Sequence, residues 1–335
     1  MTQPTKEELG LTDDYLLDLY RQLLTIRAFE ERVKYESSLG NVLGPTHLYI
    51  GEEAVAVGVC AALRPDDYIT STHRGHGHAL AKGCRPDRMM AELFGRETGY
   101  CRGKGGSQHI ADFSVGMLGA NGIVAGGIPI ATGAGLAIQL KQSDQVVVSF
   151  FGDSASNRGP FHEGINMASV WRLPVLFVCE YNHFGQYTYT RHVMRVENVA
   201  DRAAGYAIPG LVVDGNDLVA VYQAAHGAID SIRAGNGPIL LECKTYRLEG
   251  HNIGDELYYR TPGEAEAWRA KDPIGRFCTW LKDQGVLTEA LEAETQARVQ
   301  AEIDAAVTFA EASPFPAVET AVQDVFSADY PVRLS

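Results

Sequence analysis

The sequence predicts an α/β fold with a mostly parallel sheet and helices on both faces. Two short apolar runs, 146–151 and 175–179, have the composition of strands that are buried on both sides. Between them, residues 159–172 carry apolar side chains at helical spacing, and this stretch ends at Leu173-Pro174. A strand, a helix and a second strand in this order form a right-handed crossover, so the two strands are expected to lie parallel.

Other parts of the chain continue the alternation of helix and strand. Thr12 can cap a long amphipathic helix that keeps its apolar period until about Ser37. Residues 218–233 are helix-like and 238–243 are strand-like, which implies at least one more strand in the sheet. The Ala- and Glu-rich stretch 288–312 predicts a terminal helix.

Composition excludes several classes of function. The chain has 335 residues, of which 45% are hydrophobic and 21% charged, as in an ordinary globular protein. A net charge of −13 argues against nucleic acid or an anionic membrane as the main partner, because both are polyanions. The six cysteines are scattered without a CxxC pair, and neither an export signal nor a membrane span is visible. A reduced, cytoplasmic compartment is therefore expected.

Polar side chains follow both apolar runs of the crossover. Asp153 lies in Gly152-Asp153-Ser154, directly after the first run, and Asn182 follows the second. The carboxyl ends of neighbouring parallel strands meet in one crevice, so these two side chains should lie close together. A carboxylate and an amide oxygen suit magnesium, which completes its octahedron with phosphate oxygens. The alternative is that Asp153 merely caps the following helix.

The run Thr72 to His78 holds three histidines and Arg74 after a strand-like segment. Zinc is one possibility, but a structural zinc site needs a fourth protein ligand. Arg74 is a better phosphate contact, because a guanidinium forks onto two oxygens. A solvated loop without a role is the third possibility. His47 and His251 are isolated histidines, which are more often structural than catalytic, and no dinucleotide or Walker-type glycine motif is present.

The two strand ends resemble the thiamine diphosphate signature, in which Gly-Asp-Gly is followed one strand later by Asn-Asn. Ser154 stands where the second Gly belongs and Tyr181 where the first Asn belongs, but Asp153 and Asn182 are retained. Because only glycine accepts positive φ freely, Ser154 puts the diphosphate affinity in question.

The resemblance extends from about Tyr15 to about Pro316. Over this length the chain is similar to the α subunit of the thiamine diphosphate-dependent first component of the 2-oxoacid and acetoin dehydrogenase complexes. The segments that carry the likeness are 47–54, 72–78, 103–109, 121–124, 161–168, 173–175 and 258–261. Together, in the family's order, they are specific.

The family implies a three-layer thiamine diphosphate-binding fold. From its length alone, the chain could form one domain or two. The resemblance favours a helical extension at 1–40 and a cofactor-binding domain at 41–285. A C-terminal helix and tail at 286–335 would pack on that domain. The resemblance implies that Asp153, Asn182 and the backbone carbonyl of Phe184 bind Mg²⁺. The other implied cofactor contacts are His73, Arg74, Gly152, Ser154 and Ala155 at the diphosphate, and Gly122 and Val124 at the aminopyrimidine. His251 would lie beside the reactive carbon of the cofactor, with His47 lining the same space, and both are candidates for catalysis.

The resemblance also implies a reaction and partners. A β subunit would complete an α2β2 heterotetramer with the cofactor between the subunits. The enzyme would cleave a C–C bond next to the carbonyl of a small molecule, acetoin or a 2-oxoacid such as pyruvate, and pass the acyl unit to a lipoyl-bearing acyltransferase. Two alternatives stay open: a thiamine-dependent carboligase or lyase without a lipoyl acceptor, and a noncatalytic homologue with a decayed cofactor site.

Two positions bear on the substrate and on regulation. His73 stands where many oxoacid members have Tyr, and the run His-Arg-Gly-His-Gly-His is closer to acetoin-type members. Asn252 replaces the serine that certain oxoacid members use for regulation, so phosphorylation control is not expected there. Acetoin is the favoured substrate.

Overall fold

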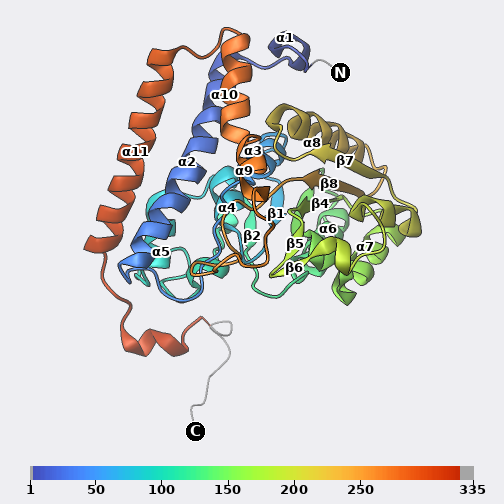
Figure 1. Cartoon of the computed structure of the whole chain (residues 1–335). Coiled ribbons are helices and arrows are strands. Elements are labelled where there is room, and N and C mark those ends of the chain that lie inside the picture. Colours follow the sequence, from blue (N-terminus) through green and yellow to red (C-terminus); the bar gives the residue numbers. More distant parts are fainter. Residues whose placement is uncertain (1–2, 325–335) are drawn as a thin grey trace.

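The computed structural model describes residues 3–324 and has a six-stranded sheet at its centre (Figure 1). The strand order is β2-β1-β3-β4-β8-β7, and all neighbouring strands are parallel. The strands are β1 (Tyr68–Thr70), β2 (Met117–Gly119), β3 (Val147–Gly152), β4 (Val175–Tyr181), β7 (Gly210–Asp214) and β8 (Ile239–Lys244). A small antiparallel hairpin, β5 (Phe184–Gly185) and β6 (Thr188–Tyr189), follows β4. The predicted α/β class and parallel sheet are confirmed.

Helices precede, connect and follow the strands. The α-helices are α1 (Lys6–Leu9), α2 (Asp13–Ser38), α3 (Glu53–Ala61), α4 (His76–Lys82), α5 (Pro86–Leu93), α6 (Gly127–Leu140), α7 (Gly159–Val170), α8 (Leu218–Arg233), α9 (Glu264–Arg269), α10 (Pro273–Asp283) and α11 (Glu289–Ala312). Short 3-10 helices are η1 (Gly106–Gln108), η2 (Phe113–Val115), η3 (Asp153–Asn157), η4 (Thr190–His192), η5 (Val199–Tyr206) and η6 (Val318–Val322). The helices expected near residues 12, 159, 218 and 288 are α2, α7, α8 and α11. Thr12 caps α2 as expected, accepting a hydrogen bond from the N–H of Tyr15 at 3.3 Å.

Strand residues alternate between two apolar clusters, one on each face of the sheet. In β3, Val148 and Phe150 pack with α2, α3 and α8, whereas Val147 and Phe151 pack with α6 and α7. This alternation follows from the two-residue period of a strand. Helices therefore cover both faces of the sheet and give the three layers.

The central crossover brings two strand ends together. β3, α7 and β4 follow one another, and β3 pairs with β4 so that Gly152 lies opposite Glu180. Asp153 follows the end of β3 directly, and Asn182 follows the end of β4. Both therefore lie at the carboxyl edge of the sheet, where open α/β sheets bind their ligands.

The glycine-rich segment 99–106 folds around a buried carboxylate. Glu92 of α5 accepts hydrogen bonds from four backbone N–H groups of this segment, at 2.7–3.0 Å. A Cβ at Gly99 would collide with Glu92, and Gly103 has a φ of 73°. The glycines at these two positions therefore serve the close turn that presents the segment 103–109.

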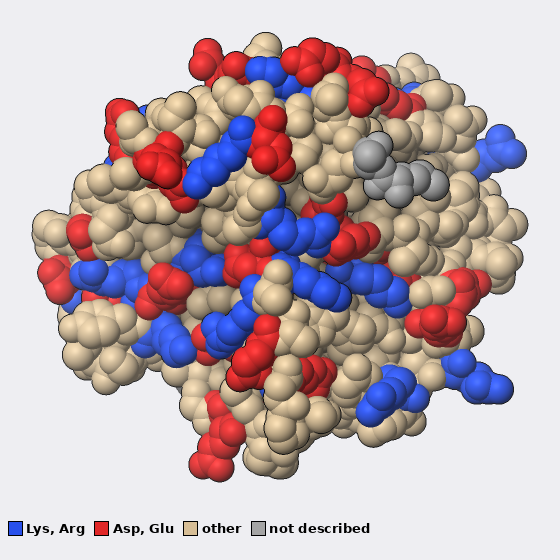
Figure 2. Space-filling model, turned by 45° about the horizontal axis from the view of Figure 1, so that its top comes forward, with Lys and Arg blue, Asp and Glu red and all other residues tan. Residues whose placement is uncertain are grey.

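The two long helices near the chain ends pack against each other. α11 contacts α2 and α5, and apolar residues of both α2 and α11 belong to the same core cluster as the sheet. The boundaries at 40 and 285 stay a prediction, and the tail predicted beyond 324 lies outside the described residues. Within residues 3–324, no helix has the length and apolar character needed to cross a membrane. On the face in Figure 2, basic and acidic side chains are interspersed, as on a solvent-exposed surface.

Candidate functional site

A cavity of about 430 Å³ opens at the carboxyl edge of the sheet. Its walls come from the segments that follow β1, β2, β3, β4 and β8. The volume lies in the range typical of small-molecule sites. Ten of the residues singled out from the sequence line it: His73, Arg74, Val124, Gly152, Asp153, Ser154, Ala155, Asn182, Phe184 and His251.

Two of the residues singled out from the sequence do not line this cavity. Gly122 lies between Asn121 and Ile123, which do line it. His47 is buried behind the wall, and its ring packs edge-on against the rings of His73 and His251, with centroids 4.7 and 4.8 Å away. Both therefore lie next to the cavity without facing it.

Asp153 is a buried carboxylate without a positively charged partner. Its side chain is 1% exposed, accepts hydrogen bonds from Ser154 N–H at 2.6 Å and Thr190 Oγ1 at 2.8 Å, and makes no ion pair within residues 3–324. Burial raises the pKa of the Asp153 carboxyl, and the hydrogen bonds from Thr190 and Ser154 oppose this only in part. An uncompensated buried carboxylate is costly, so a cation in this cavity would be stabilised by it.

The side-chain amide of Asn182 is oriented by a neighbouring glutamate. Asn182 Nδ2 donates to Glu52 Oε1 at 3.0 Å, and Asn182 Oδ1 accepts from the N–H of Phe184 at 3.3 Å. Because the amide nitrogen faces Glu52, the oxygen is the end left for a metal. Burial, followed by the charge of Glu180, raises the pKa of Glu52 to about 8, while Arg74 opposes the rise.

The two departures from the thiamine diphosphate signature are accommodated. The backbone at Ser154 does not take positive φ, so glycine is not required there. Ser154 packs so tightly against Gly185 that a Cβ at Gly185 would collide with it. Tyr181 does not line the cavity; its ring lies under Lys244 Nζ, 3.6 Å from the ring centroid. Neither substitution therefore removes a group from the cavity.

Arg74 lies in the cavity wall but is committed to the protein. Its Nη1 donates to the carbonyl of Leu48, its Nη2 donates to the carbonyl of His251 at 3.1 Å, and its Nε lies 3.5 Å from Glu52. Burial and the charge of Arg247 lower the pKa of Arg74 to about 10, so the guanidinium is still charged at neutral pH. Arg74 therefore supplies charge to the cavity and also joins two of its walls.

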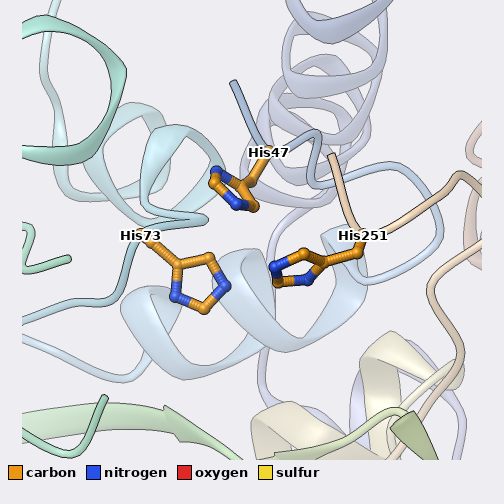
Figure 3. Close-up of side chains that lie close together, drawn as sticks. All are labelled: His47, His73 and His251. Atoms are coloured by element: carbon orange, nitrogen blue, oxygen red, sulfur yellow. The ribbon is translucent and has the colours of Figure 1, made fainter. Parts of the chain in front are cut away.

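Three imidazoles gather at one end of the cavity (Figure 3). Burial, then the charge of Arg74, lowers the pKa of His47 to about 3 and that of His251 to about 4. The same two causes lower the pKa of His73 well below its ordinary value. All three rings are therefore neutral at pH 7.

Arg247, Glu52 and Glu180 also belong to the site, although they were not predicted from the sequence. Arg247 lines the cavity and donates to the carbonyl of Gln186 at 3.1 Å and to Tyr259 Oη at 2.8 Å. It follows the carboxyl end of β8, so the strand-end rule that selected Asp153 would have found it. Glu180 also lies near the carboxyl end of β4 and lines the cavity, whereas Glu52 gave no such signal, because its role depends on tertiary contacts.

The fold and the cavity define an α/β protein whose ligand cleft lies at the carboxyl edge of a parallel sheet. Residues 21–319 match the model of the family described as dehydrogenase E1 component, and the chain belongs to this family. It is an α-type subunit of a thiamine diphosphate-dependent dehydrogenase, as the sequence predicted.

Several characterised proteins are similar over nearly their whole length. The α subunit of acetoin:2,6-dichlorophenolindophenol oxidoreductase from Bacillus subtilis is 50% identical over 323 residues, which are 96% of each chain. The Cupriavidus necator protein of the same name is 46% identical over 319 residues, 95% of this chain and 96% of that one. The α subunit of the pyruvate dehydrogenase E1 component from Zymomonas mobilis is 40% identical over 317 residues, 94% of this chain and 89% of that one.

Proposed function

We propose that this chain is the α subunit of an acetoin dehydrogenase that uses thiamine diphosphate and Mg²⁺. The observation that carries the choice of substrate is the group of three neutral imidazoles at one end of the cavity, where His73 and His251 line the wall and His47 packs behind them. Neutral imidazoles can form hydrogen bonds with the ketone and hydroxyl oxygens of acetoin. The carboxylate of a 2-oxoacid would instead be bound more strongly by a positively charged side chain that has no other partner. The higher identity to the two acetoin-type relatives than to the pyruvate-type relative supports the same choice.

The residues present fit the magnesium diphosphate group. Mg²⁺ would supply the positive charge that Asp153 lacks, and the oriented oxygen of Asn182 and the carbonyl of Phe184 would complete the protein's share of ligands. Arg74 and Arg247 would hold the remaining negative charge. The other proposed cofactor contacts are His73, Gly152, Ser154 and Ala155 at the diphosphate, and Gly122 and Val124 at the aminopyrimidine.

When bound, the cofactor supplies an electron sink for cleaving the C–C bond next to the carbonyl. The protein's task is to orient the substrate and to move protons. The backbone N–H of His251 donates to Asp255 Oδ2 at 2.6 Å, and its carbonyl accepts from Arg74, so its position is fixed on both sides. A neutral His251 can accept a proton from the hydroxyl of acetoin, and His47 packs against it as support.

A β-type subunit is the proposed partner, in an α2β2 assembly. Val124 lines the cavity and is 44% exposed, and the adjacent Ile123 is 69% exposed, so the cavity mouth is apolar and open. Helix α6 begins near this mouth and packs against α7. The two helices and the residue after α7 carry exposed apolar side chains, here called the α6–α7 apolar face: Ile130, Leu140, Met167, Val170 and Trp171. Exposed apolar side chains gathered on two packed helices are typical of a subunit contact.

Leu140→Asp is expected to weaken association with the β-type subunit by about tenfold or more, because a charge would be buried in an apolar contact. Leu140 is 76% exposed, so the chain itself should unfold at an unchanged urea concentration. The fraction of β-type subunit that co-purifies measures the effect. Val318→Asp is the matched control, because Val318 is 84% exposed and belongs to η6, which is separate from the helices α6 and α7. Equal co-purification of both variants with wild type would contradict this docking surface.

The acceptor of the acyl unit is proposed to be the lipoyl group of an acyltransferase. Acetoin and the lipoyl disulfide would give acetaldehyde and an S-acetyl dihydrolipoyl group, so the disulfide is reduced as the acyl carbon is oxidised. The test is turnover by the co-expressed α and β-type chains, with acetoin or pyruvate and a lipoylated domain. Higher kcat/KM for acetoin with acetylation of the domain is expected. Turnover without acetylation would indicate a carboligase or lyase, and cofactor binding without turnover would indicate a noncatalytic homologue.

A further inference from the structure

His47, His73 and His251 come from three separate loops and meet at one point. Their ring centroids lie 4.7, 4.8 and 5.6 Å apart, and one candidate ligand atom from each lies within 4.8 Å of the others. Figure 3 shows one ring nitrogen of each directed toward the space that the three rings share. Among residues 3–324, this is the one cluster of three His, Cys, Asp or Glu side chains with the spacing of a metal site.

The lone pairs of these rings are largely unclaimed by the protein. The buried Nδ1 of His47 has no hydrogen-bond partner among the described residues. Within residues 3–324, the one hydrogen bond that involves the rings is a long one, 3.5 Å, between Arg247 Nη1 and His251 Nδ1. By contrast, His76 and His78 are each held by a buried glutamate. Three neutral imidazoles without carboxylate partners form a set of metal ligands rather than a structural network.

We propose that His47, His73 and His251 bind a divalent transition-metal ion, with Zn²⁺ the best suited. Tetrahedral Zn²⁺ with bonds of about 2.0–2.1 Å places its nitrogens about 3.4 Å apart, so the rings must close in by small rotations. His73 and His251 lie on loops and are only half-buried, which permits this movement. The fourth position faces the cavity and takes water or a substrate oxygen. Mg²⁺ prefers oxygen ligands and does not compete for this site.

Two guanidinium groups, those of Arg74 and Arg247, lie near the three imidazoles. Arg74 is paired with Glu52 at 3.5 Å. Arg247 donates to Tyr259, whose hydroxyl donates to Asp255 at 2.7 Å. Asp255, reached through Tyr259, reduces the repulsion of a bound dication by Arg247, whereas Glu52, whose pKa is raised to about 8, offsets the charge of Arg74 only when it is ionised. A metal here would occupy the imidazoles proposed to handle protons and would block turnover. This consequence rests on the proposed function, whereas binding of the metal does not.

Calorimetric titration of Zn²⁺ into the full-length chain, in excess Mg²⁺ to occupy oxygen ligands, tests the proposal. One tight equivalent is expected in wild type. His73→Phe and His251→Phe should each lose this tight equivalent. Their affinity for Zn²⁺ should fall by more than the roughly 10- to 100-fold that is typical when a residue hydrogen-bonded to a metal ligand is removed. Co²⁺ should give the strong visible absorption of a four- or five-coordinate ion in wild type and not in these variants.

His226→Phe is the matched control, because His226 is half-exposed on α8 and forms a surface pair with Asp230. It should keep the tight equivalent. Equal Zn²⁺ binding by all four proteins would assign the metal to the surface and overturn the proposal, as would the absence of a tight equivalent in wild type. Thermal unfolding of each variant shows that it is folded, and His73→Gln replaces His73→Phe if the latter is not. Thiamine diphosphate binding, measured separately, tests the proposed function independently.

Discussion

Asp153→Asn is expected to abolish magnesium-dependent binding of thiamine diphosphate. The asparagine keeps an oxygen that can accept from the N–H of Ser154, but it removes the negative charge that would hold Mg²⁺. Removing one partner of a buried charge pair costs about 3–5 kcal/mol, which corresponds to more than about 100-fold in affinity. Calorimetry on the chain co-expressed with its β-type subunit, with and without Mg²⁺, measures this loss.

The same variant should not destabilise the protein without its cofactor. Burial raises the pKa of Asp153 because the ionised carboxyl is unfavourable in the free protein, so its removal should leave the urea midpoint unchanged or raise it. Asp230→Asn is the matched control, because Asp230 is 65% exposed on α8 and should affect neither quantity. Retention of magnesium-dependent binding by Asp153→Asn would contradict the metal site. A lower urea midpoint would instead assign Asp153 a structural role.

The elements around the central crossover could be predicted because local sequence determines them. The apolar runs of β3 and β4, and the proline that follows the helix α7, are visible without tertiary information. The edge strands β2 and β7 were not predicted. β2 has only three residues and β7 is half-exposed, so neither carries the apolar run that marks a buried strand.

The candidate site could be predicted where residues follow strand ends, and not where they meet through tertiary contacts. Asp153 and Asn182 lie at such ends, and the structure brings both to one cavity. Glu52 lies 130 residues before Asn182 in the sequence, yet it orients the amide of Asn182 at 3.0 Å. The three imidazoles come from the loop before α3, the loop after β1 and the loop after β8. No local pattern indicates such contacts.

His251→Ala is expected to lower kcat by about 10²- to 10⁴-fold, the range typical of removing a general acid or base. Affinity for thiamine diphosphate should change little, because the proposed cofactor contacts that hold the diphosphate lie at Asp153, Asn182 and Arg74. Steady-state kinetics and calorimetry on the co-expressed chains separate the two effects. His162→Ala is the matched control: His162 of α7 packs against Phe161 of the same helix and Tyr206 of η5, does not line the cavity, and its replacement should leave kcat and cofactor affinity unchanged.

The pH dependence tests whether His251 has the neutral ring that its proton-transfer role requires. Burial, followed by the charges of Arg74 and Arg247, lowers its pKa from the ordinary 6.5 to about 4 in the folded protein. The neutral imidazole therefore persists from pH 8 down to about pH 5 and is lost only as pH falls through about 4. If the neutral ring accepts the substrate proton, kcat of wild type should not fall between pH 7 and pH 6, although an exposed histidine would titrate there. A fall in kcat centred near pH 6.5 that disappears in His251→Ala would show that the ring titrates normally and would contradict this role.

An equal loss of kcat and of cofactor affinity in His251→Ala would assign the residue to binding rather than to catalysis.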